Sequence, residues 1–211
     1  MAKAEHWEHV TTIDGADFAP FNVSSGGQGA RAGKDGVSCL AFPYNVGNTP
    51  AEVIESEVPM IVEERSLWQD SAGPGEFRGG LGAEMVVQAL SPFSVTTRID
   101  RMHCKPWGLE GGGEAAGNGI AIRHKGEWSS DLPNAKIFNV RLERGDAYKM
   151  LSGGGGGFGS PFKRDADAVA HDVREGYVSR EAAEKLYGVV LDDSCEVKSS
   201  ETQQLRSKAL V

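Results

Sequence analysis

Glycine constrains this sequence more than any other residue type. The chain has 28 glycines among 211 residues, and five of them are consecutive at positions 153–157. This is nearly twice the usual share of about 7%. Each glycine costs backbone entropy on folding, so a folded chain keeps this many only where turns, positive φ angles or close backbone approaches require them. Most fall in residues 24–36, 70–82 and 106–113 and in the 153–159 run, which we expect to form long ordered loops.

The glycine run at 153–157 has two possible interpretations. Gly154, Gly156 and Gly159 satisfy the G-x-G-x-x-G pattern, but a poly-glycine run does so trivially, and Pro161 follows where a helix should open. We therefore reject a dinucleotide fingerprint. Either the run forms a nest of N–H groups around an anion, or it is a tight backbone crossing that only glycine fits. We favour the tight crossing.

Short β-rich segments separated by turn signals dominate the first three quarters of the chain. We expect strands in seven places: 10–13, after Pro59, 84–90, 93–99, 119–123, 135–142 and 146–151. Residues 51–69 are interrupted by Pro59, so we predict extended structure on both sides of it. Gly126 marks the tip of a hairpin.

The pattern changes to a helical one after residue 160. Apolar residues at helical spacing predict helices over 166–175 and 180–187. Asp165 and Ser179 are the expected N-caps, and Gly188 ends the second helix.

The expected fold class is therefore α+β: a mainly β domain with long Gly-rich loops, followed by a small C-terminal helical hairpin. We divide the chain into a β-rich domain at 1–159, the hairpin at 160–191 and a polar tail at 192–211 with one marginal helix. Val169 and Val173 should face the β domain, with Asp167, Arg174 and Glu175 in solvent.

Charge and composition exclude several classes of protein. The net charge is −8 and the pI about 5.2, which argues against nucleic acid or an anionic membrane as a partner. No apolar stretch approaches the ~18 residues of a membrane span, and the start of the sequence lacks the apolar core of a signal peptide. Three widely spaced cysteines fit a reducing compartment. We expect a cytoplasmic protein.

Few residues suggest chemistry. His103 and Cys104 are adjacent, so in a strand they would point to opposite faces, and no second pair has metal-site spacing. We predict no metal site and no catalytic residue in this chain. Asp100 and Arg101 either form a structural ion pair or loop anchor, or face a substrate. Arg78 either pairs locally or belongs to a binding loop. The candidate substrate or interface residues are Asp70, Arg78, Asp100, Arg101, Trp107, Gly154, Gly155 and Gly156.

Seven ordered blocks, covering residues 20–191, resemble the C-terminal part of hydantoinase B/oxoprolinase family subunits. The blocks are Gly-Gly-Gln-Gly-Ala-Arg-Ala-Gly-Lys-Asp-Gly (26–36), Asn-Thr-Pro-Ala-Glu-Val-Ile-Glu (48–55), Asp-Ser-Ala-Gly-Pro-Gly-Glu-Phe-Arg-Gly-Gly-Leu-Gly (70–82), Asp-Arg (100–101), Pro-Trp-Gly-Leu-Glu-Gly-Gly (106–112), Gly-Gly-Gly-Gly-Phe-Gly-Ser-Pro (154–161), and the helical residues 172–190. The sequence departs from the family pattern at Ser160, where the family often has Asp.

The resemblance implies an ATP-dependent machine. ATP is bound by a hydantoinase A-like subunit, which phosphorylates an amide or enolate oxygen, and a hydantoinase B-like subunit completes the reaction. The family's chemistries are hydrolysis of cyclic amides (hydantoins, 5-oxoproline, lactams) and carboxylation of ketones such as acetone or acetophenone. Family subunits are much longer than this chain, which lacks their metal-ligand region, and its Met start points to a split subunit.

The resemblance therefore leads us to expect a chain that completes or seals the site of an ATP-dependent ketone carboxylase or cyclic-amide hydrolase. Its partners would be larger hydantoinase A-like and hydantoinase B-like subunits. ATP with Mg²⁺ and a divalent metal would lie in those partners, and this chain would bind neither and would not be catalytic alone. The alternative is a purely structural bridging subunit with no residue in the active site.

Overall fold

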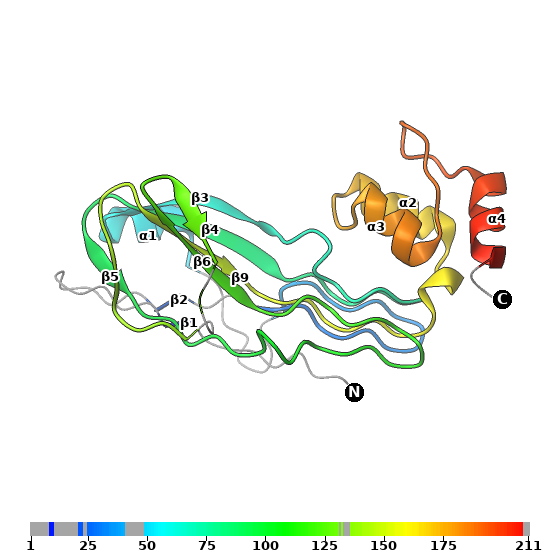
Figure 1. Cartoon of the computed structure of the whole chain (residues 1–211), viewed down its shortest axis with the longest axis horizontal. Coiled ribbons are helices and arrows are strands. Elements are labelled where there is room, and N and C mark those ends of the chain that lie inside the picture. The colour runs from blue at the N-terminus through cyan, green and yellow to red at the C-terminus, as the bar shows by residue number, and fades with distance from the viewer. Residues whose placement is uncertain are drawn as a thin grey trace.

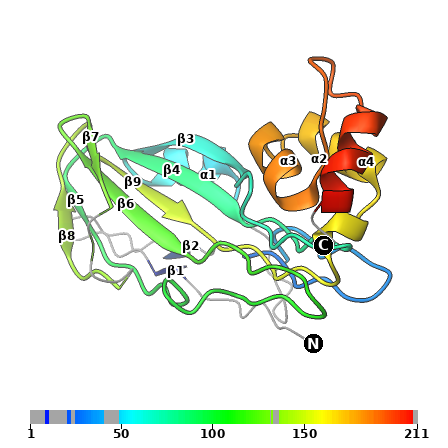
Figure 2. The same cartoon turned by 45° about the vertical axis from the view of Figure 1, so that its right-hand side comes forward.

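The computed structural model describes residues 9–10, 21–22, 25–40, 49–130, 132 and 136–208. A β-sheet and one short helix lie at one end, the other helices lie at the opposite end, and long extended segments run between them and beneath those helices (Figures 1 and 2). The predicted mixture of sheet and helix is confirmed. The elements are β1 (His9–Val10), β2 (Phe21–Asn22), α1 (Ala51–Glu57), β3 (Met60–Leu67), β4 (Ala83–Ala89), β5 (Phe93–Val95), β6 (Gly119–His124), β7 (Glu127–Ser129), β8 (Val140–Leu142), β9 (Ala147–Leu151), the 3₁₀ turn η1 (Pro161–Lys163), α2 (Ala166–Arg174), α3 (Arg180–Tyr187) and α4 (Ser199–Lys208).

The main sheet has five antiparallel strands in the order β3-β4-β9-β6-β7. On β6, Ile120 and Ile122 are buried while their neighbours are less so, the alternation expected of a half-buried strand. The separate pair β5–β8 contributes Phe93, Val95 and Leu142 to the same apolar core. This core is closed within the sheet end of the molecule.

Two strand predictions were too long, and one hairpin prediction is confirmed. β5 ends at Val95, and β8 starts at Val140, because only three residue pairs join them. Ala135, where the second strand was expected to begin, lies outside the described residues. The β6–β7 hairpin turns at Lys125 and Gly126, whose φ angles are +52° and +90°.

The prediction of extended structure over residues 51–57 is wrong, because they form helix α1. Pro50 precedes the helix with a φ of −56°, which suits a helix start. Val58, just before Pro59, is extended, because proline disfavours a helical residue in front of it. Pro59 therefore ends a helix rather than interrupting a strand, and β3 begins directly after it as predicted.

The glycine-rich stretches lie side by side and form what we call the glycine bundle, residues 25–40, 71–82, 106–117 and 153–159. The central segment, 153–159, bonds to each of the other three. Backbone hydrogen bonds of 2.9–3.0 Å join Gly153 O to Gly27 N, Gly155 N to Gly80 O, Gly155 O to Gly73 N and Gly157 N to Gly113 O. One extended segment thus bonds to three neighbours, one more than the two with which a strand in a sheet pairs.

The glycine bundle leaves no room for side chains between its backbones. A Cβ added to Gly155 would lie 2.0 Å from the carbonyl oxygen of Gln28, and one on Gly156 would lie 2.0 Å from that of Trp107. The N–H groups of Gly155 and Gly157 are taken by carbonyls of the protein. The tight backbone crossing that we favoured is therefore confirmed, and these two N–H groups are not open to an anion.

The two predicted helices and their caps are confirmed at the other end of the molecule. Asp165 accepts a hydrogen bond from the N–H of Asp167, and Ser179 accepts one from the N–H of Ala182. Gly188 ends α3 with a φ of +62°.

These helices enclose a second core, separate from that of the sheet. Its buried members are Val169, Val178, Ala183, Tyr187 and Val189, with Val173 partly buried against them. Val169 and Val173 therefore do not face the β domain as predicted, because the helices sit over the end of the glycine bundle and pack on one another (Figure 2). The expected solvent positions, Asp167, Arg174 and Glu175, are exposed.

The expected polar tail carries α4, which is tied to the rest of the helical end. The N–H of Val190 donates to Thr202 Oγ1 at 3.0 Å. Arg206 donates to the carbonyl oxygens of Tyr187 and Arg164 at 3.0 and 2.8 Å. The helix that the sequence predicted as marginal is thus held by side-chain hydrogen bonds to neighbouring backbone groups rather than by an apolar face.

We predict that Gly155→Ala prevents folding while Gly119→Ala is tolerated. The new Cβ at 155 would overlap a backbone oxygen, which rotamer change cannot relieve, whereas at 119 the nearest atom is a Leu151 side-chain carbon at an ordinary 3.5 Å. We expect a loss above about 4 kcal/mol for Gly155→Ala. Thermal unfolding followed by circular dichroism measures both, and equal Tm values would contradict the bundle geometry.

We also predict that Val169→Asp destabilises the chain by about 3–5 kcal/mol, because it places a charge in the second core, where Val169 is fully buried. Leu186→Asp is the matched control on α3, where the side chain is 43% exposed. It should cost less than about 1 kcal/mol. Urea unfolding compares the two variants, and a Val169→Asp chain as stable as the control would show that the face is assigned wrongly.

Candidate functional site

Two arginines and two aspartates meet where the glycine bundle joins the helices, and we call them the ion cluster: Asp35, Arg78, Arg164 and Asp172. Asp35 and Arg78 come from the bundle, Arg164 follows η1, and Asp172 lies on α2. Arg164 donates to Asp35 Oδ2 at 2.7 Å and to Asp172 Oδ2 at 2.9 Å. Arg78 donates to both oxygens of Asp172, at 3.1 and 3.3 Å, and its backbone N–H donates to Asp35 at 2.8 Å.

Asp35 and Arg164 of the ion cluster stay charged near neutral pH. Burial alone would raise the pKa of Asp35, but the hydrogen bond and charge of Arg164, with the N–H and charge of Arg78, hold that pKa below its usual value. Burial would lower the pKa of Arg164, but its bond to Asp35 and the charge of Asp172 raise it further above its usual range. Groups that do not titrate near pH 7 are poor proton carriers. The cluster is therefore suited to fastening two parts of the chain, not to acid–base catalysis.

Asp70 and Arg78, two of the predicted site residues, serve this same junction. Asp70 has a φ of +60°, donates its N–H to the Tyr177 carbonyl and accepts the N–H of Ser179 at 2.8 Å. The Arg78 guanidinium lies 5.5 Å from the centre of the Tyr177 ring. Arg78 does not pair locally, because its carboxylate partner, Asp172, is 94 residues further along the chain.

Asp100 and Arg101 lie at a second place, beside the start of the glycine run. Asp100 pairs with Lys136 at 2.5 Å. Asn118 donates its side-chain amide to the Asp100 carbonyl and its N–H to the Arg101 carbonyl, and its Oδ1 accepts the N–H of Gly153. This arrangement fits the ion pair and loop anchor that we weighed for these residues. A substrate-facing role remains a prediction.

The remaining predicted residues divide between surface and interior. Trp107 is 59% exposed, whereas Gly154, Gly155 and Gly156 are buried inside the glycine bundle. The structure therefore places five of the eight predicted residues in the glycine bundle and the other three, Asp70, Asp100 and Arg101, next to it in the chain or through hydrogen bonds, but does not bring their side chains together. Within the described ranges, no group of three or more His, Cys, Asp or Glu side chains could hold a metal ion.

A titratable pair at the sheet end joins two turns. His124 Nδ1 lies 2.9 Å from Asp146 Oδ2, and Asp146 also accepts the N–H groups of Lys125 and Glu143. Burial would raise the pKa of Asp146, but these hydrogen bonds lower it. Asp146 thus stays ionised and pins the β6–β7 turn to the turn before β9, a structural role.

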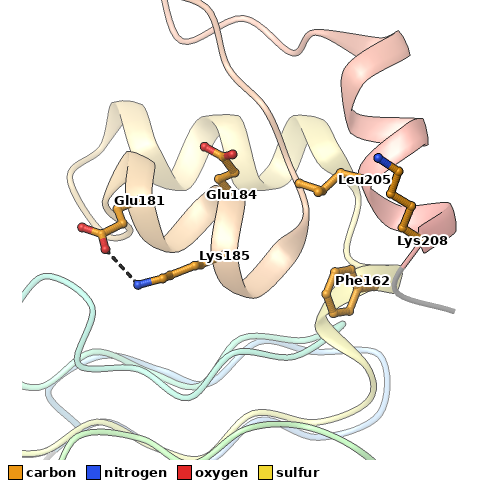
Figure 3. Close-up of a pocket in the computed structure, with 6 residues that line it drawn as sticks. All are labelled: Phe162, Glu181, Glu184, Lys185, Leu205 and Lys208. Carbon is orange, nitrogen blue, oxygen red and sulfur yellow. Dashed lines mark hydrogen bonds and ion pairs between the residues drawn. The ribbon is translucent and has the colours of Figure 1, made fainter. Parts of the chain in front are cut away.

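An open groove of about 540 Å³ lies between α3 and α4. Figure 3 shows its lining residues: Glu181, Glu184 and Lys185 stand on α3, Leu205 extends from α4 toward them, Lys208 lies on the last turn of α4, and Phe162 lies on η1. Glu181 and Lys185 are hydrogen-bonded to each other at 3.1 Å. The lining has charges of both signs and no set of groups typical of catalysis.

Sequence reasoning missed Asp35, Arg164, Asp172 and Asn118. A signal existed only for Asp172, which lies three residues after Val169 on the buried side of α2, where an unpaired charge is rarely tolerated. The other three carry no local pattern. Each of them has a partner 35 or 129 residues away, and only the tertiary fold brings these pairs together.

We predict that Asp35→Asn removes part of the acid sensitivity of folding. Because the folded-state pKa of Asp35 is lowered, its contribution is present above the usual Asp pKa of about 3.9 and is lost as the pH falls through the folded value. The variant should be less stable by about 1–2 kcal/mol at pH 7, since Asp35 is partly exposed. The difference in unfolding free energy between the variant and the parent should narrow below pH ~4.

Denaturant unfolding from pH 7 to pH 2.5 tests this expectation. Asp193→Asn, at an exposed position, is the control and should differ little from the parent at any pH. A gap for Asp35→Asn that stays constant down to pH 2.5 would show that its charge does not stabilise the fold.

Comparison with known proteins places this architecture in a family. The family model for hydantoinase B/oxoprolinase matches residues 2–161. The B component of a putative D-/L-hydantoinase from Pseudomonas sp. (strain NS671) is 32% identical over 188 residues, covering 88% of this chain and 32% of that protein. None of the described helices is long and apolar enough to cross a membrane.

Two solved structures share the fold. The nucleotide-free structure of acetone carboxylase, an enzyme of ATP-dependent acetone carboxylation, superposes with a TM-score of 0.73 at 25% identity, covering 98% of this chain and 33% of that one. The ATP-dependent caprolactamase of Pseudomonas jessenii superposes with a TM-score of 0.75 at 22% identity, covering 95% of this chain and 37% of that one. The chain thus spans about a third of the length of these relatives. It belongs to the hydantoinase B/oxoprolinase family.

Proposed function

We propose that this chain is the C-terminal part of a hydantoinase B-like subunit in a hetero-oligomeric, ATP-dependent ketone carboxylase or cyclic-amide hydrolase. The observation that carries the proposal is the superposition of 98% of the chain on acetone carboxylase, a match that includes both the glycine bundle and the helices. The hydantoinase and caprolactamase relatives support cyclic amides as the other substrate class. The partners are larger hydantoinase A-like and hydantoinase B-like subunits.

In this proposal the glycine bundle acts as a rigid wall that completes or seals a site built by the larger subunits. Its segments are hydrogen-bonded to one another and are in backbone contact, so they have little freedom to rearrange. Phosphorylated intermediates require exclusion of water, which a rigid surface at a subunit contact can provide. Asp70, Arg78, Asp100, Arg101, Trp107 and Gly154–Gly156 would then act through the shape of this surface.

ATP, Mg²⁺ and a divalent metal belong to the partner subunits in this proposal. The described part of this chain offers no cluster of three carboxylate, imidazole or thiol ligands. Three of its carboxylates, Asp35, Asp146 and Asp172, already accept hydrogen bonds from arginine, histidine or backbone N–H groups. These residues do not fit a metal, so no chemical step is assigned to this chain.

The rival proposal is a purely structural bridging subunit. It is favoured by one observation: the ion cluster and the Asp70 contacts use their polar groups to hold the chain together. For either role we propose the same organisation, a β-rich unit at 1–159 with Gly-rich loops, a helical hairpin at 160–191 and a tail at 192–211, because the two apolar cores are separate. We also propose a cytoplasmic location, since all three cysteines are free.

Reconstitution tests the proposed function. We expect the chain alone to show no ATP hydrolysis with acetone, acetophenone, hydantoin, 5-oxoproline or caprolactam. The larger subunits encoded near it should lack full activity without it, and the combination should couple ATP consumption to product. Activity of the isolated chain would disprove the proposal.

One variant distinguishes the sealing role from the bridging role. Lys105→Glu changes the charge of an exposed residue that lies directly before bundle segment 106–117 and whose ion-pair partner, Glu114, is itself exposed. If the bundle seals the site, this variant assembles but lowers turnover. If the chain only bridges, turnover per assembled complex is unchanged.

A further inference from the structure

Trp107 presents a large aromatic side chain to solvent from a fixed backbone. Trp107 is 59% exposed. Pro106, just before it, is buried, and its carbonyl accepts the N–H of Ala115 at 2.9 Å. The N–H of Leu109, two residues later, donates to Gly157 at 2.9 Å. The indole is therefore held out by the glycine bundle, and docking onto it would order no loop.

Trp128, the other exposed tryptophan in the described part of the chain, contacts cations of its own chain. Trp128 is 43% exposed, and the cations of Arg123 and Lys149 lie 5.2 and 5.4 Å from its ring centre. Among the described residues, no cation or ring makes such a contact with Trp107. Trp128 thus uses its π face internally, whereas that of Trp107 is open.

Charged residues border Trp107 in the sequence on both sides. Lys105 and Glu110 are exposed, and Lys105 pairs with Glu114 at 3.6 Å, a surface ion pair that is worth little by itself. An open aromatic side chain within a polar rim is the arrangement typical of an interface hot spot.

We propose that Trp107 is the anchor by which this chain docks onto the larger hydantoinase B-like part of the complex. The inference rests on the proposed function. The occupant follows from length: the chain corresponds to 32–37% of its relatives, so most of such a subunit has to pack against this fold from outside. The cores of the sheet end and the helical end are closed by their own elements, whereas the Trp107 side chain of the glycine bundle is exposed.

The chemistry of the indole and of the charged residues next to it defines the partner surface. It offers an apolar pocket for the ring, a carbonyl or carboxylate oxygen for the indole N–H, and hydrogen-bonding groups of both signs around it for Lys105 and Glu110. A basic or uniformly acidic surface does not fit this rim.

Binding of the purified larger hydantoinase B-like subunit, measured by isothermal titration calorimetry, tests the inference. Trp107→Ala should weaken the dissociation constant at least 10-fold, the loss typical of a hot-spot aromatic. Trp128→Ala is the matched control and should stay within about threefold of the parent, as expected of a residue outside the hot spot. Both variants are first compared with the parent by thermal unfolding.

Hydroxyl-radical footprinting of the unmodified chain keeps the test independent of folding. Oxidation of Trp107 should fall at least threefold in the complex, while that of Trp128 stays unchanged. If the parent binds and Trp107→Ala binds equally, or Trp107 is not protected, the anchor is disproved and the proposed function stands. If the parent binds no larger hydantoinase subunit at all, the proposed function itself fails, and the inference fails with it.

Discussion

The structure depends on contact between backbones that have no side chains to separate them. At Gly79, Gly82 and Gly155, an added Cβ would lie 1.7–2.0 Å from a carbonyl oxygen of another segment. Such contact lets one central segment, 153–159, hydrogen-bond to three others. The stability of the bundle therefore comes from satisfied backbone polar groups and close packing, with little apolar side-chain burial. This explains why the chain tolerates the entropic cost of so many glycines.

The ion cluster follows from this construction. A bundle built from backbone has few side chains with which to hold another unit, and the helical end has its own closed core. Arg78, a buried side chain of the glycine bundle, reaches Asp172 on α2, and Arg164 reaches back to Asp35. Buried ion pairs recover their desolvation cost only with good geometry, and removing one partner typically costs about 3–5 kcal/mol. The ion cluster thus adds little net stability but fixes how the helices sit over the bundle (Figure 1).

A rigid bundle that joins two closed cores is suited to shaping a surface for other subunits. The polar groups inside it serve the fold, so the proposed contribution to an active site is one of form and water exclusion. Trp107 is the exception, because its backbone belongs to the bundle while its ring remains available. The proposed seal and the proposed anchor both use the same property, a backbone that does not rearrange when a partner binds.

The sequence by itself determined the local structure that depends on neighbouring residues. The α2 and α3 caps, the hairpin at Lys125–Gly126, several strands and the need for glycine at 153–157 were all predicted, because caps, turns and steric exclusion act over a few residues. Helix α1 was missed because Pro59 fits a helix end and a broken strand equally well. Only the tertiary structure decided which core received Val169, and which carboxylates met Arg78 and Arg164. Those contacts join residues up to 129 positions apart, and charge pairing carries no periodic signal from which such partners can be read.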